Sequence, residues 1–324
     1  MSEEARERLR ARMPAEPLQV RVAVKLDQIV SIDQRAENFT AVVTLLVRYK
    51  DPLLAYDVLP GDRPLRMFRF DSFKAYAEGE DALWPELAFL NQQGKRDITA
   101  RTIALSPAGE VYAYTRFTTT FQAPDFDFRL FPFDHQVFHI RILSILPEGI
   151  VELMPLSGES GLGDQLGEEE WIIYDPEVTV DLRDDQIGLP SSELVLTFKA
   201  YRHLIYYVTR IFLPMLVILL VTWFTFKLKD YVKRIDVGIT TLLLFIAFNF
   251  TVSSDLPRLG YVTAMDAIMT AAFVITGAVL MVNIYLRRLQ VSEQGARAER
   301  LDRYATWLYW PAYVLGTSVA LVLL

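Results

Sequence analysis

The feature that most constrains this chain is a series of four long apolar segments that follow Tyr201. Each is long enough for a transmembrane helix, which needs roughly 20 residues to cross the hydrocarbon core. The residues before them are mixed and acidic, so the sequence predicts a soluble domain, residues 1–204, followed by a membrane domain, residues 205–324. We place the four spans at residues 205–226, 235–254, 262–286 and 305–324.

The short loops between the spans indicate how the chain is oriented. Lys227–Arg234 and Arg287–Arg303 are both basic, and the second carries five arginines against three acids. Basic short loops mark the cytoplasmic side of a membrane protein. Both termini and the acidic soluble domain are therefore expected on the extracellular or periplasmic side of the cell (inner) membrane. Residues 1–14 lack the apolar segment of a signal peptide, so we expect a mature or trimmed chain.

Composition argues against several other classes of protein. The 324 residues include no cysteine, which excludes disulfides and cysteine-based zinc sites. The net charge of −7 argues against a nucleic-acid partner. The sequence shows no nucleophile–base motif, no histidine cluster with metal-ligand spacing and no glycine-rich phosphate loop. We therefore expect no enzymatic activity, no cofactor and no bound metal.

The soluble half is typical of a β-sandwich. In LQVRVAVKLDQIV, apolar Val20, Val22 and Val24 alternate with polar residues, as in a half-buried strand. Residues 99–121 read as a hairpin with Ser-Pro-Ala-Gly at the turn. Short strands at this spacing predict an immunoglobulin-like sandwich of about ten strands. Apart from a short helix near the N-terminus, SEEARERLR, we expect little helix in this half.

The second span carries a stripe of residues that lipid would not favour. On a helix, spacings of four and three place them along one face. If several copies surround an axis, the aspartate forms a carboxylate ring that attracts cations, and the leucine forms an apolar ring that gates by excluding water. The alternative is a helix-packing face in which Asp236 pairs with Arg234, Lys233 or Lys229. The stripe consists of Asp236, Thr240, Leu243, Ala247, Phe250 and Ser254.

One stretch of the soluble half resembles a family signature. DFRLFPFDHQ, residues 127–136, is similar to the signature loop of pentameric ligand-gated ion channels, the Cys-loop receptor superfamily. The similarity extends to LPRL after the second span, to the tyrosines and proline of the first span, and to EEEWII in the soluble domain. Animal members close the loop with a disulfide. Its absence here matches the bacterial branch.

The resemblance implies a homopentamer in which the second span lines the pore, at the stripe described above. It also implies that the signature loop contacts the membrane domain, with Asp134 buried against Arg202. A purely structural salt bridge is the alternative role for that pair. The expected gating interface consists of Asp33, Phe131, Pro132, Phe133, Asp134, Arg202 and Pro257.

The permeating ion follows from two charges near the start of the second span. At 100° per residue, Arg234 is rotated about 200° from Asp236, so only the aspartate faces the axis. We therefore expect permeating cations, with lipids around the other faces of the spans. A membrane-anchored small-molecule sensor that does not conduct is the alternative function.

The sequence constrains the stimulus that would open the channel less than it constrains the pore. Family members bind agonists between neighbouring sandwiches, in an aromatic box that suits amines through cation–π attraction. Against an amine cage, Ile145 replaces an expected aromatic residue, and the loop RDDQIGLPSSEL contains none. Protonation is the other expected trigger, with His203 beside Arg202 as the candidate sensor. The candidate agonist residues are Trp84, Tyr112, Tyr114, Trp171 and Tyr174.

Overall fold

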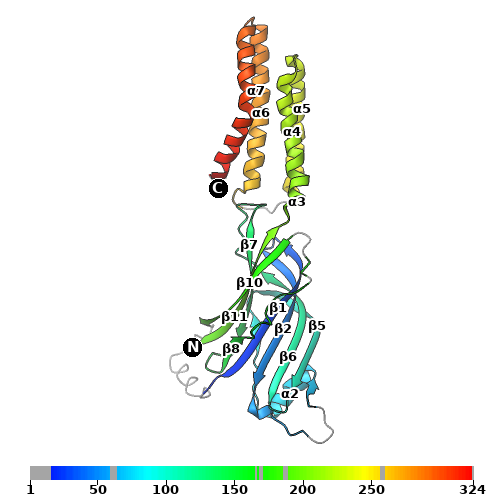
Figure 1. Ribbon diagram of the computed structural model, residues 1–324, viewed down its shortest axis with the longest axis vertical. Helices are drawn as coiled ribbons and strands as arrows, with labels where there is room; N and C mark the ends of the chain where they lie inside the picture. Colours follow the sequence, from blue (N-terminus) through cyan, green and yellow to red (C-terminus); the bar gives the residue numbers. More distant parts are fainter. Residues whose placement is uncertain are drawn as a thin grey trace. The chain divides into compact units, whose positions relative to one another are not determined.

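The computed structural model describes residues 16–58, 64–164, 166–167, 171–184, 189–255 and 260–322, without the side chains of residues 253–255 (Figure 1). The chain divides into two compact units. The sandwich unit comprises the chain up to Phe126 together with Gln136–Tyr201. The helical unit comprises Asp127–His135 and the chain from Arg202 onward. The signature loop therefore belongs with the helices, although it lies within the sequence of the sandwich.

The sandwich unit consists of two sheets, as the sequence predicts (Figure 1). In the described residues, the larger sheet has the order β3-β5-β6-β2-β1-β8, with β9 also paired to β1, and the smaller has the order β10-β11-β7-β4. The larger sheet contains β1 (Leu18–Asp33), β2 (Asn38–Lys50), β3 (Arg66–Phe68), β5 (Gln92–Leu105), β6 (Glu110–Gln122), β8 (Val151–Pro155) and β9 (Gly161–Leu162). The smaller sheet contains β4 (Leu87–Phe89), β7 (His135–Ser144), β10 (Trp171–Asp184) and β11 (Pro190–Arg202).

Side-chain alternation along the strands produces the core between the sheets. Val20, Val22 and Val24 of β1 are fully or almost fully buried. They contribute to a core with Phe39, Phe138 and other aromatic residues from both sheets. The predicted hairpin is also confirmed, because β5 and β6 pair antiparallel on either side of the Ser-Pro-Ala-Gly turn.

The expectation of little helix in the soluble half is wrong at one place. Helix α2 spans Phe70–Gly79, and a short 3-10 helix, η1, spans Pro52–Leu54. Phe73 and Ala77 lie four residues apart on α2 and are fully buried, so the helix packs one short apolar face into the core. The helix predicted near the N-terminus lies outside the described residues.

The helical unit contains the predicted spans with changed boundaries. Among the described residues, Leu204–Lys227, Tyr231–Val252 and Ala264–Val291 are long and apolar enough to cross a membrane. The fourth predicted span is helical but is not among them. Helix α6 contacts α4, α5 and α7. The elements are α3 (Leu204–Tyr207), π-helix η2 (Val208–Phe212), α4 (Leu213–Phe224), η3 (Thr225–Lys227), α5 (Tyr231–Asp255), α6 (Ala264–Val291) and α7 (Gly295–Val322).

The predicted cytoplasmic loop, residues 287–303, is largely helical. Helix α6 continues to Val291 and α7 begins at Gly295, so only residues 292–294 interrupt the helices. The segment is rich in Arg, Ala, Leu and Glu, which are strong helix formers, and its charges suit a helix that extends into water.

Candidate functional site

The predicted stripe of α5 is exposed on the single chain. Leu243 retains 61 % and Phe250 76 % of their accessible surface, large values for apolar side chains. Asp236, Thr240 and Ala247 are exposed as well. The hydroxyl of Thr240 donates a hydrogen bond to the carbonyl oxygen of Asp236 (2.9 Å), as threonines in membrane helices do. The side chain of Ser254, the last member of the stripe, lies outside the described residues.

Another face of α5 packs against the rest of the helical unit. Thr241, Phe245 and Val252 are buried. At Gly238 a Cβ atom would approach Leu280 of α6 to 3.1 Å, so the two helices lie close together there. Within one chain, the stripe is therefore not the packing face of α5. In the described part of the chain Asp236 forms no ion pair, which contradicts the pairing that the packing alternative requires.

Arg234 lies on the buried face and forms a different pair. Its guanidinium contacts both carboxylate oxygens of Asp302 on α7, at 2.6 and 3.1 Å. It also donates to the carbonyl oxygens of Leu228 (2.6 Å) and Phe226 (2.9 Å). The arginine side chain is 5 % exposed and the aspartate 20 %. The positive charge two residues before Asp236 is thus neutralised inside the subunit, away from the stripe.

The signature loop is attached to the start of α6. The backbone amide of Ala264 donates to the carbonyl oxygen of Arg129 (2.7 Å), and that of Met265 donates to the carbonyl oxygen of Phe131 (3.1 Å). The hydroxyl of Tyr261 accepts a hydrogen bond from the amide of Phe128 (3.0 Å). The first amides of a helix have no partner within the helix, so the loop supplies acceptors that α6 needs.

The predicted pair Asp134–Arg202 is present in the helical unit and is almost completely buried. Nε of Arg202 lies 3.2 Å from Oδ1 of Asp134, and the two side chains are 0 % and 1 % exposed. Nη1 of Arg202 donates to the hydroxyl of Tyr207 (3.1 Å), and the guanidinium carbon lies 4.8 Å from the ring centre of Phe131. Because isolated buried charges are strongly unfavourable, this cluster fixes the loop against the start of the first span.

The aromatic residues of the loop divide between two environments. Phe131 is buried and packs edge-on against Tyr207, with 5.3 Å between ring centres. Pro132 is buried as well. Phe133 stacks on Phe212 at 6.0 Å but keeps 48 % of its surface exposed. Phe131 and Pro132 are therefore packed inside the helical unit, whereas Phe133 presents a partly exposed apolar ring.

Two predicted members of the gating interface are not placed in this cluster. Asp33 belongs to the sandwich unit, where its carboxylate accepts hydrogen bonds from the amides of Arg35 (2.9 Å) and Ala36 (3.0 Å) in its own turn. Its approach to Asp134 stays a prediction. Pro257 lies outside the described residues.

Two of the candidate agonist residues pack in the sandwich core. Trp171 is 6 % exposed and contacts Phe138 edge-on at 6.2 Å. Trp84 packs against Phe70 and Phe73, at 5.3 and 5.7 Å, on the side of α2 that faces the core. A role in the core, which the sequence left open for any of these aromatics, accounts for both tryptophans.

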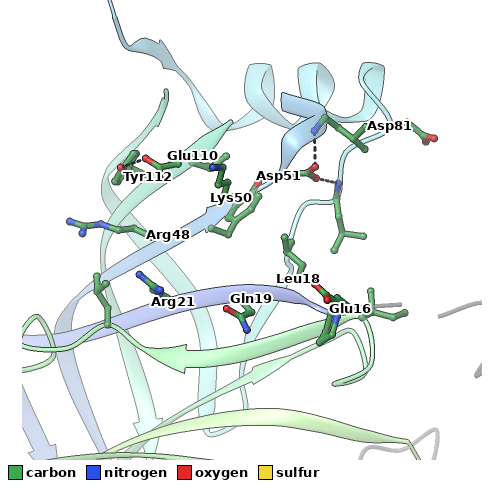
Figure 2. A pocket seen from close by; sticks show the side chains of 17 residues that line it. Glu16, Leu18, Gln19, Arg21, Arg48, Lys50, Asp51, Asp81, Glu110 and Tyr112 are labelled. Carbon is green, nitrogen blue, oxygen red and sulfur yellow. Dashed lines mark hydrogen bonds between the residues drawn. The ribbon is translucent and has the colours of Figure 1, made fainter. Parts of the chain in front are cut away.

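The three candidate tyrosines are more accessible but do not gather within one chain. Tyr112 and Tyr114 lie two residues apart on β6 and are 36 % and 37 % exposed. Tyr174 lies on β10, in the other sheet, and contacts Tyr201 at 5.6 Å. The guanidinium of Arg48 lies 5.2 Å from the ring centre of Tyr112, so the face of that ring already contacts a cation (Figure 2). One subunit therefore contains no formed aromatic cage among these five residues.

The histidines differ in their surroundings. His203 is half-buried at the N-cap of α3, where its side chain forms no capping hydrogen bond. His139 of β7, which the sequence did not single out, shares a hydrogen bond with the hydroxyl of Thr197 (3.0 Å). Burial lowers the pKa of His139, with a smaller opposing effect from the charge of Asp125.

Sequence comparison places these features among known proteins. Residues 4–151 match the family model of the neurotransmitter-gated ion-channel ligand binding domain. The chain is 29 % identical over 315 residues to a proton-gated ion channel of Gloeobacter violaceus, a match that covers 95 % of this chain and 84 % of that protein. It is 26 % identical over 290 residues to a beta-like gamma-aminobutyric acid receptor subunit of Drosophila melanogaster, covering 85 % of this chain and 57 % of the subunit.

A further match, to the gamma-aminobutyric acid receptor subunit beta-4 of Gallus gallus, is 25 % identical over 319 residues and covers 91 % of this chain and 61 % of the subunit. The chain thus spans less than two thirds of the length of these two receptor subunits. The bacterial relative is matched along most of both chains, across both units described above. The chain is thus similar to the ligand-binding domain of this family over residues 4–151 and to a proton-gated ion channel along nearly its whole length.

Proposed function

We propose that this chain is the subunit of a homopentameric, cation-selective channel in the cell membrane, with the stripe of α5 lining the pore and the sandwich unit outside. The observation that carries the proposal is the exposure of Asp236 and Thr240 on the same stripe as Leu243 and Phe250, on a helix whose other face is packed. An exposed carboxylate and hydroxyl on this stripe suit a water-filled axis better than lipid.

The charges of α5 support cation selectivity. Asp236 is exposed on the stripe, whereas the nearby Arg234 is buried and paired with Asp302. A ring of Asp236 carboxylates, one from each subunit, would concentrate cations, and no guanidinium ring would oppose it. Lipids would cover the remaining apolar surface of the spans, for example Val217 and Met281, which are also exposed.

For the trigger, we propose protons acting on the sandwich unit and the signature loop. The relative that matches along most of both chains is named a proton-gated ion channel. An amine-like agonist, bound in an aromatic box between neighbouring sandwiches, is the alternative trigger. Histidine is the side chain that most often changes charge near neutral pH, and the chain has three: His135, His139 and His203.

Current recordings from the purified chain in a bilayer test the proposal. Stepping the pH in asymmetric salt should evoke a current whose reversal potential lies near that of the cation. In Asp236→Asn the reversal potential should move toward zero, while Glu293→Gln, which neutralises an acid in the turn after α6, should leave it unchanged. An intact oligomer that stays silent under pH steps and applied amines would instead indicate a non-conducting sensor.

A further inference from the structure

A groove of about 1100 Å³ lies at one end of the sandwich unit, where β1 and β6 begin and β2 ends (Figure 2). Its walls also include residues next to α2 and on either side of β8. None of these strand ends takes part in the proposed pore or in the signature loop. The groove is large enough to enclose a small organic molecule.

An arginine pair forms one end of the groove. Arg21 of β1 and Arg48 of β2 are direct partners across the two antiparallel strands. Both side chains are exposed, and in the described part of the chain neither forms an ion pair with a carboxylate. Like charges directly opposite one another on a sheet repel each other, and a bound anion would relieve that repulsion. Two guanidinium groups on paired residues suit a single carboxylate, to which each can donate.

Tyr112 supports this end from the next strand. It is the register partner of Arg48, and its ring stacks under the guanidinium at 5.2 Å. The tyrosine hydroxyl donates to Oε2 of Glu110 (2.8 Å). Glu110 is thereby engaged with a phenol.

The other acids do not compensate the arginine pair. Asp51 is buried and accepts hydrogen bonds from the backbone amides of Leu53 (3.0 Å) and Leu83 (3.4 Å). Figure 2 shows Asp81 and Glu16 at the opposite end of the groove from Arg21 and Arg48. The groove is thus positive at one end.

Between the ends the walls combine polar residues, Gln19, Lys50 and Asp51, with apolar side chains (Figure 2). Leu18, Leu83 and Val111 contribute to the lining, and Leu53 keeps 56 % of its side chain exposed there. Tyr49 also lines the groove, and in the described residues its buried hydroxyl has no hydrogen-bond partner. Burial and the charge of Asp51 raise the pKa of Tyr49, so this hydroxyl stays protonated as an unused donor beside the groove.

We propose that this groove binds a small organic carboxylate, with its anionic group between Arg21 and Arg48 and its apolar body against Leu53. An inorganic anion offers the charge without the apolar body, and an amine offers the opposite charge. The proposal therefore predicts an order of affinity: benzoate first, sulfate second, and benzylamine without measurable binding. It concerns binding to the sandwich unit and holds whether or not the protein conducts.

Calorimetric titration of the purified full chain with benzoate, sulfate and benzylamine tests this order. Arg21→Gln and Arg48→Gln should each weaken benzoate binding about tenfold or more, since a hydrogen bond to a charged group is typically worth that much. The matched control is Arg66→Gln, because Arg66 of β3 also stacks on a tyrosine, Tyr56, at 3.8 Å but lies outside the groove. The control should keep the wild-type affinity.

A second variant separates the apolar contact from the charge. Leu53→Ser changes an exposed side chain, so folding should be unaffected, and it should weaken benzoate while leaving sulfate unchanged. Equal benzoate binding in wild type and in the Arg21→Gln/Arg48→Gln double variant would overturn the proposal. Binding of benzylamine as tightly as benzoate would overturn it as well.

Discussion

Replacing Asp134 by asparagine removes one charge from the buried cluster of the helical unit and leaves its shape nearly unchanged. Arg202 would keep its hydrogen bond to Tyr207 and its contact with the ring of Phe131, but its charge would lose the carboxylate at 3.2 Å. Both side chains are at most 1 % exposed, so water cannot replace the lost partner. Breaking such a pair typically costs about 3–5 kcal/mol.

The expected loss is large enough for a thermal unfolding measurement on the purified protein. At about 2–4 °C per kcal/mol, the unfolding midpoint should fall by on the order of 6–20 °C. Glu86→Gln is the control, because it removes the acid from an exposed pair with Lys74, at 3.0 Å with side chains 41 % and 51 % exposed. An exposed pair contributes about 0–1 kcal/mol, so the control should shift the midpoint by little.

A double variant tests the physical reason for the loss. Asp134→Leu combined with Arg202→Met replaces the pair by apolar side chains, which often restores or exceeds the original stability. The double variant should therefore unfold at a higher temperature than Asp134→Asn alone. If Asp134→Asn unfolds at the same temperature as Glu86→Gln, the carboxylate does not balance the buried arginine and the reasoning is refuted.

Two further predictions concern charge selectivity and pH. Asp302→Asn removes the acid that holds Arg234, so one guanidinium per subunit becomes available beside each Asp236. Under a tenfold salt gradient, the reversal potential should therefore move toward zero from a limit of about 59 mV. An unchanged value would mean that Arg234 stays in place without Asp302. Because burial lowers the pKa of His139, the folded state favours the neutral imidazole; the stability it contributes is present above the ordinary pKa of about 6.5 and is lost as the pH falls below it. His139→Gln should therefore flatten the loss of the unfolding temperature between pH 7 and 5, and an unaltered acid profile would contradict this.

Local patterns in the sequence predicted most of the sandwich. The alternation of Val20, Val22 and Val24 and the turn after residue 105 each depend on neighbours along the chain, and both elements were confirmed. Helix α2 was missed because its buried face consists of little more than Phe73 and Ala77, too few positions for a period to be visible. The charges of segment 287–303 indicate exposure to water, but only the structure shows that α6 and α7 extend through most of it.

The sequence predicted those parts of the site that a family motif or a helical period indicates. The exposed stripe of α5 follows from its spacing, and the pair of Asp134 with Arg202 follows from the family resemblance. The partner of Arg234 did not, because Asp302 lies 68 residues away and its contact depends on how α5 and α7 pack. The aromatic candidates stay a prediction, because the expected box lies between neighbouring subunits and one chain does not decide which of them share a surface.

Because Asp127–His135 belongs to the helical unit, the design of chimeras between this protein and its relatives depends on where the parental sequences are joined. The amides of Ala264 and Met265 at the start of α6 depend on carbonyl oxygens of that loop, although the sequences lie more than a hundred residues apart. A chimera joined only between Tyr201 and Arg202 would set one parent's loop against the other parent's helix. The loop should therefore be inherited together with the helices, and substitutions in it should co-vary with those in the first turn of α6.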